Sequence, residues 1–123
     1  MKKASITPIV RYLDETRAVP CPFGDVRRIV TGGEGISNIH VVSVTKGGEH
    51  YHKAYDEVYY FLSGKGAITL DAKTYPVRPG TVTVIPAGMV HSLLSDTDEP
   101  LVFIIIGTPP MSIEDDRAMP QKP

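Results

Sequence analysis

The chain has 123 residues, with 13 lysine or arginine side chains, 14 aspartate or glutamate side chains and a formal net charge of −1. This length fits one domain that can bury a core without disulfides. The balanced charge lacks the basic excess of a nucleic-acid-binding protein, and no run approaches the roughly 20 apolar residues of a membrane span.

The single cysteine and the amino-terminal segment indicate the compartment. Cys21 lies between two prolines and cannot form an intrachain disulfide, so we predict that it lies in a loop of a protein from a reducing compartment. Met1 to Lys3 are basic, but no signal-peptide core follows them. We therefore expect a cytoplasmic protein with neither a membrane nor a nucleic-acid partner.

Short apolar runs separated by glycines and prolines predict an all-β sandwich or barrel. Eleven residues of each of these two types interrupt the chain, and no window shows a long helical period. We expect a core barrel over about residues 27–106, an amino-terminal arm over 1–26 and a tail over 107–123, in which 112–119 form one helical turn capped by Ser112. In chain order the predicted strands are 27–31, 39–45, 50–52, 57–62, 67–70, 75–77, 81–85, 91–94 and 101–106.

Four polar residues fall on or beside these strands. His50 and His52 project from one face with Cα atoms roughly 6.5 to 7 Å apart, Glu57 follows a turn, and His91 begins another strand. Each has an ordinary interpretation alone: a solvent-facing or hydrogen-bonded histidine pair, a solvated carboxylate and a core histidine. Together they offer three imidazoles and one carboxylate, a donor set that suits a transition metal.

The spacing of these residues resembles the two sequence motifs of the cupin superfamily. The first is H-x-H-x4-E-x6-G, which ends at Gly64, and the second is G-x5-P-x-G-x2-H over "GTVTVIPAGMVH", which ends at His91. This resemblance covers roughly residues 39–106 and implies a double-stranded β-helix, the jelly-roll barrel, in a single cupin domain. It also implies one metal ion held by His50, His52, Glu57 and His91.

Two positions depart from the family pattern. Val44 stands where the first motif usually begins with glycine, and Ser95 stands where the second usually ends in asparagine. Neither position is a ligand in the pattern, so the metal prediction is unaffected. Both positions bear on the shape of the pocket mouth and on one turn.

The predicted cofactor is one divalent transition metal, namely Fe, Mn, Ni, Zn or Co. An ion that prefers six ligands keeps open positions beside four protein ligands, whereas zinc can be closed and structural with the same four. The sequence does not name the metal, because affinity order alone does not decide which ion is bound in a cell.

The alternation of side chains along a strand predicts the residues beside the metal. Tyr59, Phe61, Met89 and Leu93 share the ligand face and form the candidate substrate pocket, while Tyr51 faces the other side. The alternative is that these residues are ordinary barrel core. Tyr59 is the candidate catalytic residue, because its hydroxyl needs a partner if it is buried.

The whole chain resembles small stand-alone cupins described as phosphomannose-isomerase-like. We expect a metal-dependent enzyme of small-molecule metabolism, an oxygenase or an isomerase, whose ligand chelates the metal through oxygen atoms. The alternative is a non-catalytic cupin that binds or senses a small ligand. Fold does not decide between them.

A second copy of the chain is the expected protein partner. Residues 101–106, "LVFIII", are apolar at every position, so both faces of this strand need cover and we predict a homodimer. The alternative is that the amino-terminal segment of the same chain covers the outer face. His40, outside both motifs, is predicted to be structural.

Overall fold

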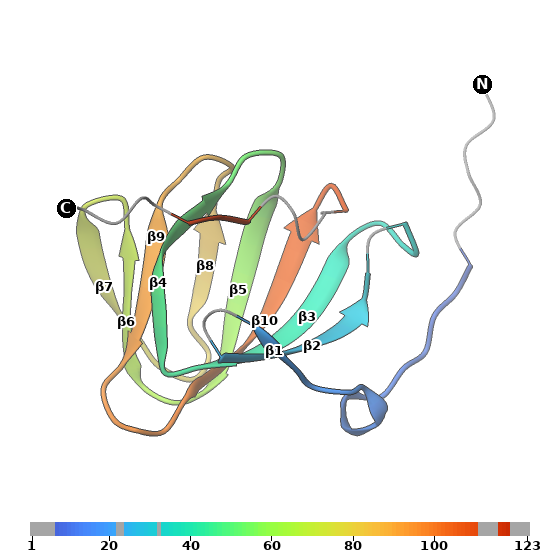
Figure 1. Ribbon diagram of the computed structural model, residues 1–123, viewed down its shortest axis with the longest axis horizontal. Coiled ribbons are helices and arrows are strands. Elements are labelled where there is room, and N and C mark those ends of the chain that lie inside the picture. The colour runs from blue at the N-terminus through green and yellow to red at the C-terminus, as the bar shows by residue number, and fades with distance from the viewer. Residues whose placement is uncertain (1–6, 22–23, 32, 111–115, 119–123) are drawn as a thin grey trace.

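The protein is a jelly roll of two antiparallel sheets (Figure 1). The computed structural model describes residues 7–21, 24–31, 33–110 and, by backbone alone, 116–118. In these ranges the strand order is β1-β2-β3-β10-β5-β8 in one sheet and β11-β4-β9-β6-β7 in the other. The elements are η1 (Leu13–Glu15), β1 (Val19–Cys21), β2 (Gly24–Val30), β3 (Asn38–Val44), β4 (Lys46–His52), β5 (Asp56–Ser63), β6 (Gly66–Leu70), β7 (Lys73–Val77), β8 (Val82–Ile85), β9 (His91–Ser95), β10 (Leu101–Thr108) and β11 (Asp116–Ala118).

The all-β prediction is confirmed, since every predicted strand overlaps one of these elements. The largest shift in a boundary is in β4, which begins at Lys46 and not at residue 50. The first sheet begins at Val19, before the expected start of the core near residue 27. No helix among the described residues has the length and apolar character needed to cross a bilayer.

The prediction that Cys21 lies in a loop is wrong. This residue ends β1 and is half-buried against the core. β1 is an edge strand of its sheet, and Pro20 is tolerated there because an edge strand pairs on one side only. The prolines that suggested a loop are therefore compatible with a short strand.

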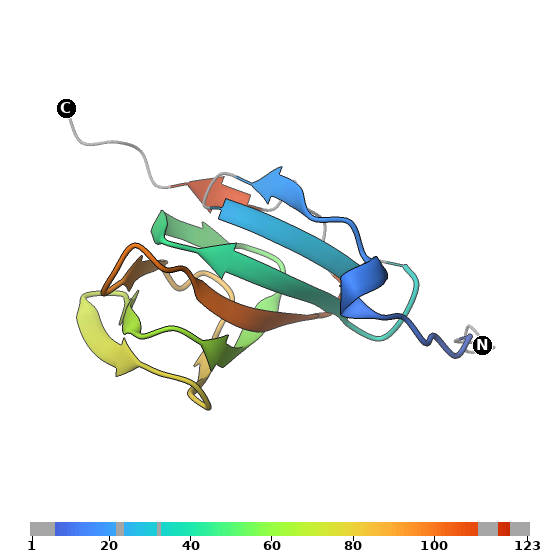
Figure 2. The same cartoon turned by 90° about the horizontal axis from the view of Figure 1, so that it is seen from below.

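The predicted helical turn at 112–119 is also wrong for residues 116–118, the part of this range that the structure describes. Residues 112–115 and 119 lie outside the described residues, but Asp116–Ala118 form β11 and pair antiparallel with β4 (Figure 2). Without β11, β4 would be an edge strand with unpaired backbone groups. Pairing with that edge outweighs the weak helical preference of a single turn.

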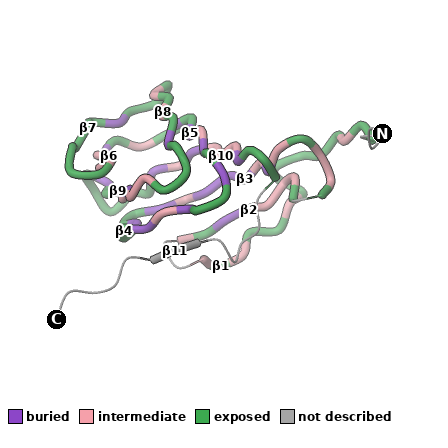
Figure 3. The backbone as a smooth tube through the Cα atoms, turned by 90° about the horizontal axis from the view of Figure 1, so that it is seen from above, coloured by how far each residue is buried: buried purple, intermediate pink, exposed green. Residues whose placement is uncertain are grey.

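The core lies between the two sheets, and along the strands buried residues are interspersed with more exposed ones (Figure 3). On β5 the buried residues are Glu57, Tyr59 and Phe61, and the residues between them are half-buried or exposed. This alternation is the predicted one. The core cluster comprises Val26, Val42, Val44, Tyr59, Phe61, Ile68, Val77, Ile85, Leu93, Leu101 and Phe103.

The outer face of the first sheet is covered in part by the amino-terminal segment. Tyr12 and Leu13 line a groove of about 480 Å³ with Val41 and Val102, and Arg27 anchors this segment by donating to the Leu13 carbonyl oxygen at 3.0 Å. Farther along the same face, on β5 and β8, four large apolar residues are exposed: Tyr60, Leu62, Val82 and Val84.

Candidate metal centre

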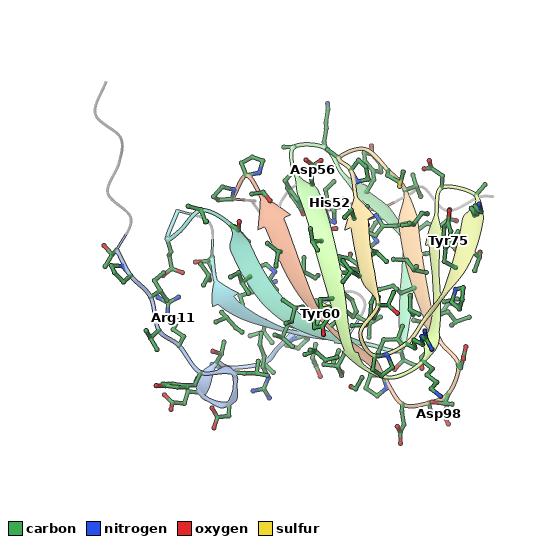
Figure 4. The ribbon with its side chains drawn as sticks, turned by 180° about the vertical axis from the view of Figure 1, so that it is seen from behind. Arg11, His52, Asp56, Tyr60, Tyr75 and Asp98 are labelled. Atoms are coloured by element: carbon green, nitrogen blue, oxygen red, sulfur yellow. The ribbon has the colours of Figure 1, made fainter. Side chains whose placement is uncertain are left out.

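The four predicted metal ligands meet between the two sheets, near the turns that join β4 to β5 and β8 to β9. His50 and His52 are on β4, and the β4–β9 register places His91 directly opposite His50. Glu57 comes from β5 in the other sheet. His52 and Asp56 lie at the same end of the sandwich, and Asp98 lies at the other end (Figure 4).

These four side chains are almost completely buried. The exposed fractions are 7% for His50, 5% for His52, 2% for Glu57 and 1% for His91. One ring nitrogen from each histidine lies within 4.8 Å of the other two. A group this polar and this buried needs partners, and a shared metal ion would provide them.

Glu57 is in contact with two of the histidines. Its Oε1 lies 3.1 Å from His52 Nε2 and 3.4 Å from His91 Nε2, and the Tyr59 hydroxyl donates to it at 3.2 Å. Burial alone raises the pKa of Glu57, but the hydrogen bonds from His52 and His91 outweigh it and lower the pKa to about 2. Glu57 is therefore a carboxylate at neutral pH, which is the form that binds a metal.

His50 is held in its neutral form. Burial and the nearby His91 lower its pKa to about 4. Its Nδ1 lies 2.9 Å from the Gly48 carbonyl oxygen, and His91 Nδ1 lies 3.0 Å from the Met89 carbonyl oxygen. A carbonyl oxygen only accepts, so both histidines carry a proton on Nδ1, and the neutral His50 leaves its Nε2 for a metal. The donor set therefore fits a divalent transition metal.

Sequence reasoning missed Tyr55. This residue is buried in the turn between β4 and β5, its hydroxyl contacts His52 Nδ1 at 2.5 Å, and its ring stacks on the His52 ring with centroids 4.5 Å apart. The only sequence signal was an aromatic residue inside "KAYD", a stretch that otherwise has the composition of an exposed turn.

Backbone contacts hold this turn in place. The Ala87 amide donates to Asp56 Oδ1 at 2.8 Å, and the Gly88 amide donates to the His52 carbonyl oxygen at 2.7 Å. The β4–β5 turn and the β8–β9 turn are thereby joined. His52 and Tyr55 are fixed relative to each other by this framework.

The predicted pocket residues lie in or against the core. Tyr59 reaches the site, with its hydroxyl 3.1 Å from His91 Nε2. Phe61 and Leu93 belong to the core cluster, and Met89 packs against it half-buried. Their part in substrate binding remains a prediction. The buried His40 is on β3, outside the cluster of three histidines.

The fold and the grouped histidines define a jelly-roll protein with a candidate metal site. Residues 39–107 match the cupin domain family, and the chain belongs to this family. Over 69 residues it is 41% identical to the glucose-6-phosphate isomerase of Thermococcus onnurineus, a match that covers 50% of this chain and 35% of the isomerase. The chain thus spans about a third of the length of that relative.

Solved structures share the fold. A protein from Planctomyces limnophilus superposes with a TM-score of 0.81 at 28% identity, covering 90% of this chain and 96% of that one. The oxalate decarboxylase of Bacillus subtilis, which has Mn(II) centres, superposes with a TM-score of 0.73 at 24% identity, covering 87% of this chain and 31% of that one.

Proposed function

We propose that this protein is a metal-dependent enzyme that acts on a small molecule with oxygen donors, and that its reaction is an isomerisation. The observation that supports this proposal most is the buried group of three histidines, whose ring nitrogens lie within 4.8 Å of one another, with the Glu57 carboxylate against two of them. Outside a metal site, such a group would be costly to bury.

The proposed ligands are His50, His52, Glu57 and His91, and the proposed cofactor is one divalent ion among Fe, Mn, Ni, Zn and Co. Such an ion would supply Lewis acidity toward a bound oxygen atom. Three neutral imidazoles and one carboxylate leave the site with residual positive charge, which favours an anionic or enediol-like ligand.

Tyr59 is the proposed proton-handling residue. Its hydroxyl is buried between Glu57 Oε1 and His91 Nε2, so it can donate a hydrogen bond to a substrate oxygen beside the ligands or return a proton to it. The aromatic core behind it, including Phe103 at 4.7 Å between ring centroids, keeps water away from that side.

Similarity favours isomerisation over oxygenation. The curated relatives that match at 41% identity are glucose-6-phosphate isomerases, although the match covers about a third of their length. An aldose–ketose isomerisation moves a proton between neighbouring carbons and consumes no oxidant. A buried hydroxyl next to the site is suited to that task.

The test is turnover by separately loaded metal forms. The metal-free protein would be loaded with each of the five ions and incubated with glucose 6-phosphate, while ketose formation and oxygen uptake are followed. We expect interconversion with at least one ion, loss of it in Tyr59→Phe, and no loss in Tyr60→Phe, whose ring is exposed on the outer face of the same strand. Oxygen uptake without interconversion would favour the oxygenase. Ligand binding without any consumption would favour the non-catalytic binder.

A further inference from the structure

The three histidines of the metal centre do not have the same kind of partner on Nδ1. His50 and His91 each contact a backbone carbonyl oxygen through this atom, at 2.9 and 3.0 Å. His52 Nδ1 instead contacts the Tyr55 hydroxyl. A carbonyl oxygen can only accept a hydrogen bond, whereas a phenol hydroxyl can donate or accept. His52 is therefore the histidine whose partner allows the proton on either ring nitrogen.

The contacts of His52 place its proton on Nε2 in the absence of metal. Nε2 lies 3.1 Å from Glu57 Oε1, and a carboxylate oxygen accepts but does not donate. The proton between these two atoms therefore belongs to Nε2. Nδ1 then has a lone pair, to which the Tyr55 hydroxyl donates. This arrangement is a continuous chain of hydrogen bonds from Tyr55 through His52 to Glu57.

Metal binding requires the opposite tautomer. An imidazole binds a metal through a lone pair, and Nε2 is the ring nitrogen of His52 that faces the Glu57 carboxylate. The proton of His52 must then move to Nδ1, and the atom that faces Nδ1 must become an acceptor. A hydroxyl does this by rotating its hydrogen away, without movement of the ring.

We propose that Tyr55 is a positioning residue of the metal centre: its hydroxyl donates to His52 Nδ1 in the metal-free protein and accepts from His52 Nδ1–H once Nε2 binds the metal. This inference rests on the proposed metal centre and adds to it a fifth residue, which occupies one of the unspecified positions of the first motif. Tyr55 is suited to the role because it is buried, with 3% of its surface exposed, and because its ring stacks on His52 at an interplanar angle of 24°.

The proposal predicts the histidine tautomers before and after metal binding, and nitrogen-15 NMR of the full chain reads them directly. In the metal-free protein, above about pH 7.5 where free histidine is neutral, we expect His52 to carry its proton on Nε2 and His50 to carry its proton on Nδ1. Adding diamagnetic Zn²⁺ should move the His52 proton to Nδ1 and leave that of His50 unchanged. A metal-free protein in which His52 already has its proton on Nδ1 would overturn the proposal.

Substitution of Tyr55 tests the same role through the affinity of the protein for Zn²⁺. Loss of a partner behind a metal ligand typically weakens metal binding by about 10- to 100-fold, and we expect a Zn²⁺ dissociation constant raised by this factor in Tyr55→Phe. Tyr60→Phe is the matched control, because it removes a tyrosine hydroxyl from an exposed position. This variant should bind Zn²⁺ as the unmodified protein does. Equal affinity in Tyr55→Phe and the unmodified protein would overturn the role of Tyr55 alone. Failure of the unmodified protein to bind Zn²⁺ would overturn the metal centre itself, and if Tyr55→Phe does not fold, the NMR measurement on the unmodified chain still decides.

Discussion

His50 and His91 face each other across β4 and β9, with their ring centroids 4.1 Å apart. Two imidazoles this close would repel if both were protonated, and the low pKa of His50, about 4, reflects its burial and then this neighbour. The pair is therefore set by strand register, and His50 is held neutral by its surroundings. Two of the four proposed ligands are thus in place before any metal arrives.

Removal of one of these histidines tests the ligand set. His91→Ala should weaken divalent metal binding by more than about 100-fold, because loss of a ligand should cost more than loss of a residue behind one. His40→Ala is the matched control, since His40 is also a buried strand histidine but is outside the cluster. Elemental analysis and a metal titration would measure both variants. Full metal content in His91→Ala would refute the four-ligand site.

The stability of the metal-free protein should fall in acid. The unfolded chain binds a proton at His50 below about pH 6.5, whereas the folded chain binds it only below about pH 4. Between these values the unfolded state holds more protons, so the free energy of unfolding falls as the pH is lowered, by on the order of 3 kcal/mol in total. Glu57 adds a loss of the same sign below about pH 4.5, since its pKa is lowered to about 2.

Urea unfolding at a series of pH values measures this dependence. His50→Gln cannot titrate, so its stability should change less between about pH 6.5 and about pH 4.5 than that of the unmodified protein. A stability of the unmodified, metal-free protein that does not change across this range would contradict the argument.

The homodimer predicted from "LVFIII" should form through the outer face of the first sheet. On this face Ile104 lies between Val41 and Tyr60, and Val58 lies opposite Val84, so apolar side chains of four neighbouring strands adjoin one another. Such a face favours association with an equally apolar surface. Val84→Lys should give a monomer of 13.4 kDa by sedimentation.

The control for this substitution is Leu94→Lys, which places the same charge at an exposed apolar position on the second sheet. It should leave the dimer intact. A monomeric unmodified protein at micromolar concentration, or a dimer that survives Val84→Lys and dissociates in Leu94→Lys, would contradict the proposed face.

Alanine substitutions at two glycines compare the cost of steric crowding with the cost of backbone strain. A Cβ at Gly66 would lie 2.2 Å from the Leu94 carbonyl oxygen, which is backbone and cannot move aside. Gly66→Ala should therefore lower the free energy of unfolding by about 3 kcal/mol or more. Gly80 has a φ of +89° and open space around it, so Gly80→Ala should cost only about 1 to 2 kcal/mol. Denaturant unfolding would measure both, and the reverse order would show that crowding at β6 is relieved by strand movement.

Strand identity and side-chain face could be predicted because alternation is a local property of the sequence. On β5 the buried positions Glu57, Tyr59 and Phe61 follow from period-two spacing once the strand is placed. The strands β1 and β11 could not be predicted in this way. Pro20 obscures the first, and the second depends on the edge of β4, a strand distant in the sequence.

The site was predictable as a residue set but not as a network. Motif spacing named His50, His52, Glu57 and His91 together, and strand pairing places His91 opposite His50. Spacing contains no information about Tyr55, because its contact with His52 depends on how the turn folds back over the ring. Partners from turns are the part of a metal centre that sequence patterns describe least well.

The position of β10 determines when this site can be completed during synthesis. β10 lies between β3 and β5 and pairs with both, so the strand that holds Glu57 lacks a central neighbour until residues 101–108 have left the ribosome. The histidine pair on β4 and β9 depends on earlier residues and can form first. Because β10 is synthesised after β4, β5 and β9, we expect the histidine pair to assemble before the central neighbour of the Glu57 strand is in place.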